Sequence, residues 1–294
     1  MTSFGEIVQV LVSGATIGSV YALVALGLVL LYRTTRILNF AHGDIGVLAT
    51  FIAYSIFTSL KLPFGLSFLL ALVAAAAIGA LIYLLLVKPA KNRSELGLLI
   101  LTLGLALALG GLDALVFGSD NKLIPTLMSD RIVHLAGASF SLASLVTAAF
   151  GLVLMLALWA LLSFTKLGLA MRAVAQREDV AEAMGLPVRV VLMATWAAAA
   201  VLAAAAAMLF APSTLLNPTM MLDPLSKGFV AAVIGGMNSL PGAVLGGYVL
   251  GILELLVGVY LSLEFKASFA FLIVIIVLVT RPHGILGKPD VKRV

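Results

Sequence analysis

Long apolar stretches recur along this 294-residue chain, and they constrain its fold more than any other feature. A helix needs about 20 apolar residues to cross the hydrocarbon core of a bilayer, which is roughly 30 Å thick. The stretches are continuous, rich in Leu and Ala, and without a strict period of two, so they indicate helices rather than barrel strands. Because 63% of the residues are hydrophobic and only 11% are charged, the chain lacks the polar side chains that a soluble domain needs at its surface.

The apolar stretches predict an all-α, polytopic integral membrane protein that forms one domain over residues 1–294, with about eight or nine transmembrane helices. The N-terminal residues lack the basic start and small-residue cleavage site of a signal peptide, so we expect the first stretch to be retained. Some helices are expected to be broken or re-entrant. The expected spans are 7–32, 45–60, 64–87, 96–117, 142–164, 190–211, a glycine-broken pair at 228–240 and 242–261, and 267–280.

The distribution of Lys and Arg predicts the orientation, because cytoplasmic loops carry an excess of these residues. The loops on one side of the expected spans hold most of them, so this side should be cytoplasmic, with the N-terminus outside and the C-terminus inside. This role accounts for the basic residues without a nucleic-acid-binding patch. The rich side carries Arg33, Arg36, Lys88, Lys91, Arg93, Lys166, Arg172, Arg177, Arg189, Arg281, Lys288, Lys292 and Arg293, and the poor side Lys61, Lys122, Arg131, Lys227 and Lys266.

A charged segment, GLAMRAVAQREDVAEAMGLP at 168–187, interrupts the apolar stretches on the predicted cytoplasmic side. Asp179 followed by Glu182 resembles a capping box, Gly185 suits the position after a helix end, and Pro187 blocks continuation. The segment therefore predicts two short helices, at 169–176 and 180–184. Its many alanines would let another protein approach closely. An interfacial helix lying on lipid is the alternative, but the segment lacks aromatic anchors and a basic surplus.

The segment at 168–187 resembles the coupling loop of ABC importer permeases, which contacts the cytoplasmic ATPase. The stretch ALGLVLLYRTTRILNFAHGDIGVLATFIAY at 25–54 is similar to the first signature of the branched-chain amino acid permeases of the LivH type. The stretch GFVAAVIGGMNSLPGAVLGGYVLGILE at 228–254 is similar to the second. The resemblance covers nearly the whole chain, in order.

This resemblance implies a type II ABC importer-like permease in the inner membrane of a bacterium or archaeon. The chain would carry branched-chain amino acids, or related small amino acids or amides, inward. Its implied partners are a second permease subunit in a heterodimer, two cytoplasmic ATPase subunits and an external substrate-binding protein. The chain has no G-x-x-x-x-G-K-[ST] phosphate loop, so it should hold no cofactor, ATP and Mg would bind the ATPase subunits, and the chain is not itself an enzyme. The same system carrying urea or short amides is an alternative.

The resemblance also implies which residues couple the permease to its ATPase. They lie in a cytoplasmic coupling loop at 166–189, where a moving ATPase would push on the membrane helices. The expected contact residues are Arg172, Ala173, Glu178, Asp179, Glu182 and Gly185.

Two regions combine glycine with polar side chains inside apolar sequence, and they are the candidates for the translocation path or gate. Broken helices are tolerated at depth only when they are buried in protein or face a water-filled cavity, and such breaks line many substrate paths. In the first region, capping of the second span by Asn39 and Asp44 is an equally good interpretation. The candidates are Asn39, His42, Gly43, Asp44, Gly235, Gly236, Asn238 and Gly242.

Glycine also has a packing role, because Gly247 and Gly251 form a G-x-x-x-G step. We expect this face to pack within the chain, rather than against the partner permease.

Three carboxylates fall inside apolar stretches, namely Asp44, Asp113 and Glu254. Such residues usually find partners or face the interior of a bundle. They support the main rival hypothesis, a self-contained proton- or ion-coupled transporter, although Asp113 could simply reach the membrane interface. No metal site is expected, because the chain has no cysteine and its three histidines lack ligand spacing. A hydrolase or channel has no supporting motif.

Overall fold

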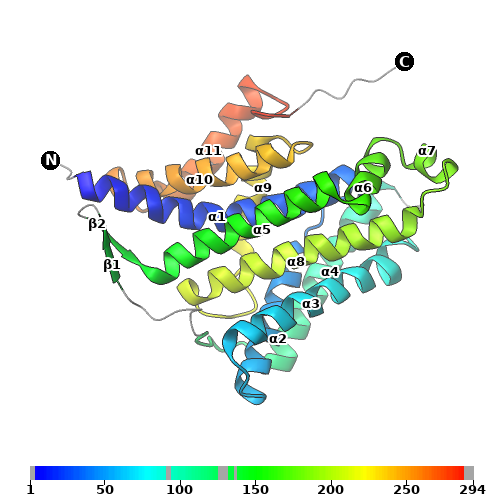
Figure 1. The fold of residues 1–294 in the computed structure, drawn as a ribbon. Coiled ribbons are helices and arrows are strands. Elements are labelled where there is room, and N and C mark those ends of the chain that lie inside the picture. The colour runs from blue at the N-terminus through cyan, green and yellow to red at the C-terminus, as the bar shows by residue number, and fades with distance from the viewer. Residues whose placement is uncertain (1–3, 91–93, 125–131, 136–137, 288–294) are drawn as a thin grey trace. The chain divides into compact units, whose positions relative to one another are not determined.

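The chain folds into helices joined mostly by short connections, as the computed structural model shows for residues 4–90, 94–124, 132–135 and 138–287 (Figure 1). By its internal contacts the chain divides into two compact units, each built from segments that are distant in sequence. Unit 1 comprises Met1–Val29, Thr126–Leu152 and Pro224–Val294, and unit 2 comprises Leu30–Pro125 and Val153–Asp223. Each unit is described by itself.

Unit 1 contains most of helix α1 (Phe4–Thr35) and the start of α5 (Leu142–Phe164). It also contains α9 (Leu222–Gly235), α10 (Leu240–Tyr260) and α11 (Phe265–Thr280). Strands β1 (Ile132–Leu135) and β2 (Ala138–Ser141) form a small antiparallel hairpin, with Ile132 opposite Ser141. The expectation of an all-α protein is therefore wrong for this stretch, where β-branched and aromatic residues favour paired strands.

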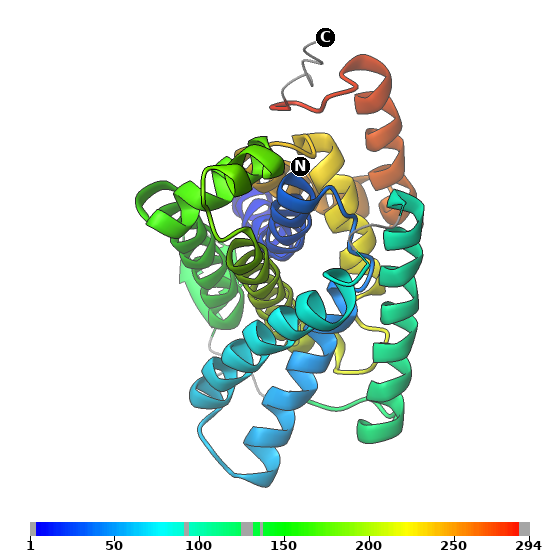
Figure 2. The ribbon, with the colours of Figure 1, turned by 90° about the vertical axis from the view of Figure 1, so that its right-hand side faces the viewer.

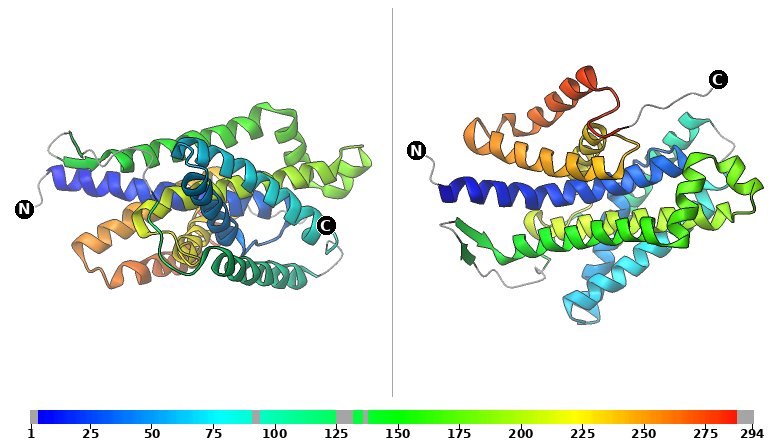
Figure 3. Two further views of the ribbon diagram at one scale, coloured as in Figure 1. Left: turned by 90° about the horizontal axis from the view of Figure 1, so that it is seen from below. Right: turned by 45° about the horizontal axis from the view of Figure 1, so that its top comes forward.

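Glycines bring α1 and α10 into backbone contact within unit 1, where the two helices lie side by side (Figure 3). A Cβ atom at Gly251 would lie 2.5 Å from Cα of Gly18, and one at Gly247 would lie 2.5 Å from Cα of Ala22. The G-x-x-x-G step of α10 thus packs within the chain, as expected. Its counterpart on α1, Gly14 and Gly18, has the same four-residue spacing, which was the signal that the sequence analysis missed.

Unit 2 is built around α2 (His42–Ser59), α3 (Phe64–Ile82) and α8 (Val188–Thr214), which pack on one another. Figure 2 shows α2 and α3 as a hairpin. A π-helical turn (Tyr83–Val87) extends α3, and α4 (Glu95–Phe117), α6 (Lys166–Gln176) and α7 (Glu178–Ala183) complete the unit. Close packing again depends on glycine, because a Cβ atom at Gly46 or Gly79 would lie 2.5 Å from a carbonyl oxygen of α8.

Within the described residues, six helices are long and apolar enough to cross a membrane: α1, α3 with its π-helical turn, α4, α5, α8 and α10. Their ends agree with the expected spans to within a few residues. Among all the expected spans, the largest difference in a boundary is at α9, which begins at Leu222 instead of residue 228. Lys227 therefore lies inside a helix and not in the expected external loop. Six of the basic residues that predict the orientation lie outside the described residues: Lys91, Arg93, Arg131, Lys288, Lys292 and Arg293.

Candidate functional site

The charged segment folds into α6 and α7, a bent pair of short helices in unit 2 (Figure 1). Thr165 begins α6 by accepting a hydrogen bond from the backbone N–H of Gly168 at 3.0 Å. Gly168 allows the tight turn from α5, because a Cβ atom there would lie 2.5 Å from Cα of Leu162. Met171 and Val174 bury one face of α6. The pair is thus anchored on its own chain by an apolar face.

The capping box expected at the start of α7 is wrong. Arg177 occupies the N-cap position in an extended conformation, and Asp179 lies in the first turn of the helix. Instead of capping the helix, Asp179 pairs with the guanidinium of Arg177, whose Nε donates to Oδ1 at 2.9 Å. This hydrogen bond lowers the pKa of the Asp179 carboxyl to about 2. The carboxylate also lies near the positive end of the helix dipole, so it stabilises the bend without a capping hydrogen bond.

The end of α7 confirms the expected role of Gly185, which has φ +82°. Its N–H donates to the carbonyl of Glu182 at 2.9 Å, and the N–H of Leu186 donates to that of Ala181 at 3.0 Å. These two bonds form a Schellman motif, which closes a helix with a left-handed residue. Glycine is needed here because other residues are strained at this φ.

The outward face of α6 and α7 carries both charged and large apolar side chains. Arg172, Asp179 and Glu182 are exposed, whereas Ala173 and Glu178 are half-buried. The small side chains therefore serve partly to pack the pair on its own unit. Three exposed apolar residues were missed by the sequence analysis, namely Leu169, Val180 and Met184, which are 61%, 46% and 80% exposed. Together with Arg172 and Glu182, they form what we call the elbow surface.

The first polar region is a break between α1 and α2, at residues 36–41. Asn39 does not cap α2, because Ala41 holds the N-cap position. Instead, its side-chain oxygen accepts a hydrogen bond from the N–H of Ala41 at 3.1 Å. The hydroxyl of Thr102 in α4 donates a hydrogen bond to the carbonyl of Leu38 at 3.1 Å. Thr102 lies seven residues after the first residue of α4. The break thus lies about 10 Å along α4 from its first residue, inside the unit.

Polar groups at this break are buried and incompletely paired. Asn39 and His42 are 1% and 0% exposed, and Gly43 is buried beside them in the chain. Among the described residues, neither ring nitrogen of His42 has a hydrogen-bond partner. The amide nitrogen of Asn39 has none there either. Buried polar groups without partners are rare in folded proteins. This supports a functional interpretation of the break over a purely capping one.

Helices α2 and α4 run parallel and form a seam with carboxylates in the middle. Farther along the seam than the carboxylates, the rings of Phe51 and Phe117 stack with their centroids 4.7 Å apart. Asp44 lies close to Asp113 and repels it electrostatically. Asp113 is 0% exposed, so its carboxyl is enclosed by protein within the unit. The spacing of Thr102, Leu109 and Asp113 explains this, because it puts all three on the buried face of α4.

The second polar region is the break between α9 and α10 in unit 1. Gly235 ends α9, Gly236 has φ +107°, and Ser239 begins α10 by accepting from the N–H of Gly242 at 3.1 Å. Gly235 and Gly242 are in backbone contact. Helix α9 therefore ends five residues before its expected end at 240, and α10 begins two residues before its expected start at 242, because Pro241 sits in the first turn of α10 rather than ending a helix.

The segment after α11 covers this break, which sequence analysis did not predict. The N–H groups of Ile285 and Leu286 donate to the carbonyls of Ile234 and Gly235 at 2.8 and 3.1 Å. Gly284 has φ +78°, and a Cβ atom on it would lie 2.5 Å from Cα of Gly236. The terminal carbonyls of α9 are thus satisfied by a segment about 50 residues later in the chain.

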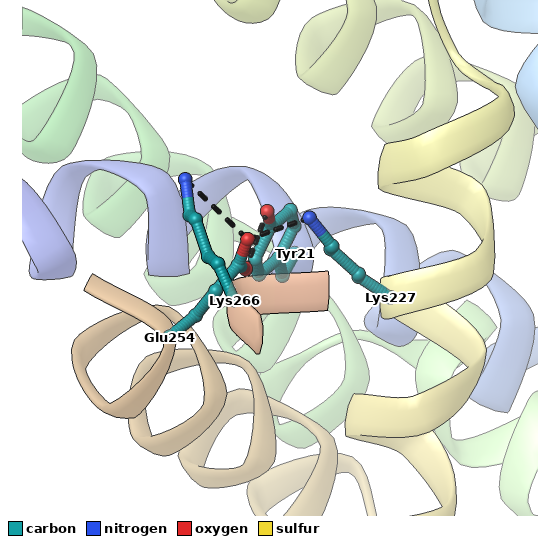
Figure 4. A network of polar contacts seen from close by, with 4 residues as sticks. All are labelled: Tyr21, Lys227, Glu254 and Lys266. Carbon is teal, nitrogen blue, oxygen red and sulfur yellow. Dashed lines mark hydrogen bonds and ion pairs between the residues drawn. The ribbon is translucent and has the colours of Figure 1, made fainter. Parts of the chain in front are cut away.

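Glu254, the third buried carboxylate, is the centre of an ionic cluster in unit 1 (Figure 4). Its Oε1 lies 2.6 Å from Nζ of Lys227 and 3.5 Å from Nζ of Lys266. Its Oε2 accepts a hydrogen bond from the Tyr21 hydroxyl at 2.9 Å. Lys227 also lies over the ring of Tyr21, 5.6 Å from its centroid. One carboxylate therefore links α1, α9, α10 and α11.

The candidates from the two polar regions lie in different units of the chain. Asn39, His42, Gly43 and Asp44 belong to unit 2, whereas Gly235, Gly236, Asn238 and Gly242 belong to unit 1. Among the described residues, no three His, Cys, Asp or Glu side chains are placed to hold a metal ion.

Comparison with known proteins gives matches over almost the whole chain. A family model described as the permease component of the branched-chain amino acid transport system matches residues 10–278. The chain is 34% identical to the high-affinity branched-chain amino acid transport system permease protein LivH of Escherichia coli (strain K12), over 97% of each chain. It is 32% identical to the corresponding protein BraD of Pseudomonas aeruginosa, over 97% of each, and 30% identical to a probable LivH of Methanocaldococcus jannaschii, over 95% of this chain and 92% of that one. No solved structure matches.

Proposed function

This chain belongs to the family of permease components of the branched-chain amino acid transport system, and we propose that it is a membrane subunit of an ABC importer. Membership makes it a multi-pass transport permease and not an enzyme. The proposal adds that it carries branched-chain amino acids inward, across the inner membrane of a bacterium or archaeon. ATP hydrolysis on partner subunits would drive the transport.

The observation that carries this proposal is the elbow surface. Leu169, Val180 and Met184 are large apolar side chains exposed on a short helix pair, where the charged Arg172 and Glu182 are also exposed. Exposed apolar groups flanked by charges are typical of protein interfaces. The Schellman motif and the anchored face of α6 make the pair stiff enough to transmit a push from an ATPase. In this proposal, Arg172, Ala173, Glu178, Asp179, Glu182 and Gly185 couple the two proteins, and ATP and Mg bind only the ATPase.

The proposed topology has nine crossings, made by α1, α2, α3, α4, α5, α8, α9, α10 and α11, with the N-terminus outside and the C-terminus inside. The parallel arrangement of α2 and α4 supports it, because two parallel helices require a crossing between them. The burial of Lys227 also supports it, since this removes a basic residue from the outer side.

We further propose a second, related permease subunit and an external binding protein as partners. The rival hypothesis of a self-contained carrier has less support from Glu254, because two lysines and a tyrosine already contact this carboxylate. Carriage of urea or short amides by the same ABC system remains the alternative substrate hypothesis.

The test is to purify the full chain, carrying an affinity tag, from its native membrane in mild detergent and to identify what accompanies it. Stoichiometric recovery of a second permease and of ATPases with a phosphate-binding loop is the expected result. Uptake of leucine, isoleucine, valine, urea and acetamide by proteoliposomes that contain this complex then identifies the substrate class. Recovery of the chain alone, with solute uptake driven by a proton gradient, would overturn the proposal.

A further inference from the structure

Two carboxylates in the seam between α2 and α4 lack the partners that Glu254 has. Neither oxygen of Asp113 accepts a hydrogen bond from any described residue, although the side chain is 0% exposed. Asp44 accepts a hydrogen bond from its own backbone N–H, and its side chain is half-exposed. The two carboxylates repel each other. The seam therefore holds two neighbouring carboxyl groups that form no ion pair with any described basic residue.

Such an arrangement points to a cationic ligand. A charged side chain within a membrane helix is costly, and it is usually paired or marks the path of a substrate or ion. Carboxylates that repel one another are stabilised by a cation that binds between them. Glu254 shows what the same chain does with a structural carboxylate, because it surrounds that side chain with two ammonium groups and a hydroxyl.

We propose that Asp44 and Asp113 bind the α-ammonium group of the amino acid during translocation, which rests on the proposed function above. An ammonium group has three hydrogen-bond donors and no acceptor, so it matches two carboxylates that only accept. Asp44 is half-exposed, whereas Asp113 is buried, where reduced solvent screening strengthens the attraction.

The position of the pair fits this role. A Cβ atom on Gly110 would lie 3.8 Å from Oδ1 of Asp44, which places Asp44 level with the last two turns of α4. Gly110 is fifteen residues from the first residue of α4, or about 22 Å along its axis. In the proposed topology this level is in the outer half of the membrane, where an importer receives its substrate.

The experiment measures equilibrium binding of radiolabelled leucine to the purified complex of the full chain with its co-purifying subunits, without the external binding protein. Two competitors test which end of leucine, the ammonium group or the carboxylate, the complex recognises. Leucine methyl ester keeps the ammonium group and lacks the carboxylate, whereas 4-methylpentanoate keeps the carboxylate and lacks the ammonium group. The variants are Asp113→Asn, Asp44→Asn and the conservative Asp113→Glu. Asp120→Asn is the matched control, since it removes an exposed carboxylate just beyond the end of α4.

We expect the methyl ester, and not 4-methylpentanoate, to compete with leucine for the wild-type complex. Asp113→Asn and Asp44→Asn should each weaken leucine binding by about tenfold or more, because a charge-assisted bond is lost. Asp113→Glu should recover part of the affinity, and Asp120→Asn should match the wild type.

Three results would overturn the proposal. Unchanged leucine affinity in both Asn variants would mean that the pair holds only a proton or an inorganic cation. Loss of the second permease from the Asp113→Asn complex would mean that the cation is a side chain of that subunit. Competition by 4-methylpentanoate alone would mean that the carboxylate is the recognised end. Failure of the proposed function is distinct, because the wild-type complex would then neither bind nor transport leucine, isoleucine or valine.

Discussion

Nζ of Lys227 lies 2.6 Å from Oε1 of Glu254, and both side chains are almost completely buried, at 7% and 1% exposure. Lys266 and Tyr21 contact the same carboxylate from α11 and α1. Glu254 therefore balances two ammonium groups, whereas Lys227 contributes only one of the two charges that balance Glu254. This asymmetry determines which substitution the protein should tolerate.

We predict that Glu254→Gln destabilises the protein by about 3–5 kcal/mol, because it leaves buried positive charge without a counter-charge. Lys227→Met should cost less, because Lys266 and Tyr21 still stabilise the carboxylate. Lys266→Met should cost least, because its side chain is 31% exposed. Unfolding of the detergent-solubilised variants by denaturant, followed by tryptophan fluorescence, measures the order. A larger loss for Lys227→Met than for Glu254→Gln would contradict this account of the cluster.

The contact between α1 and α10 gives a second prediction. Gly251→Ala would place a methyl group 2.5 Å from the backbone of Gly18, so the two helices must separate, at a cost of about 1–3 kcal/mol. Gly111→Ala is the matched control, because a Cβ atom there meets nothing within 4 Å. Thermal unfolding in detergent should show a lower midpoint for Gly251→Ala alone. Equal midpoints would mean that α1 and α10 are not in tight contact.

The sequence predicted most of the spans because an apolar stretch of sufficient length is a local property. It also predicted Gly185 as a helix end, because the reason for glycine lies in the conformation of that one residue. The two polar breaks were recognised for the same reason, since Asn39 and Gly236 interrupt apolar sequence where they stand. The α2–α4 seam was not predicted as a pairing of Asp44 with Asp113, because 69 residues separate them.

Features that depend on distant or competing partners were missed or wrong. The sequence predicts a loop at Lys227, because the partner of this residue, Glu254, lies 27 residues later in the next helix. Asp179 was expected to cap α7, but a neighbouring arginine competes for its carboxylate. The contact between Gly236 and Gly284 has no local signal, because either glycine alone fits an ordinary turn.

Gly185 provides a third prediction, on the shape of the elbow. Gly185→Ala should weaken the end of α7 by about 1 kcal/mol, because alanine is strained at φ +82°. Gly185→Asn should be milder, since asparagine tolerates this conformation better than other residues. Hydrogen exchange of the peptide that contains Leu186, measured on the detergent-solubilised protein, reports the two Schellman hydrogen bonds. Equal protection in all three proteins would show that these bonds do not depend on glycine.

The elbow surface gives the last prediction, and its apolar residues should matter more than its charges. Met184→Glu and Leu169→Glu should each reduce co-purification of the ATPase subunits by about tenfold or more, because a few well-buried apolar anchors dominate most interfaces. Glu182→Arg should reduce it less, since a charge at the rim of an interface changes mainly the rate of association. Leu60→Glu is the control, because Leu60 is 65% exposed, close to the 61% of Leu169, but lies in the α2–α3 loop. If Glu182→Arg alone released the ATPase, recognition would be electrostatic and the exposed apolar residues would instead face lipid.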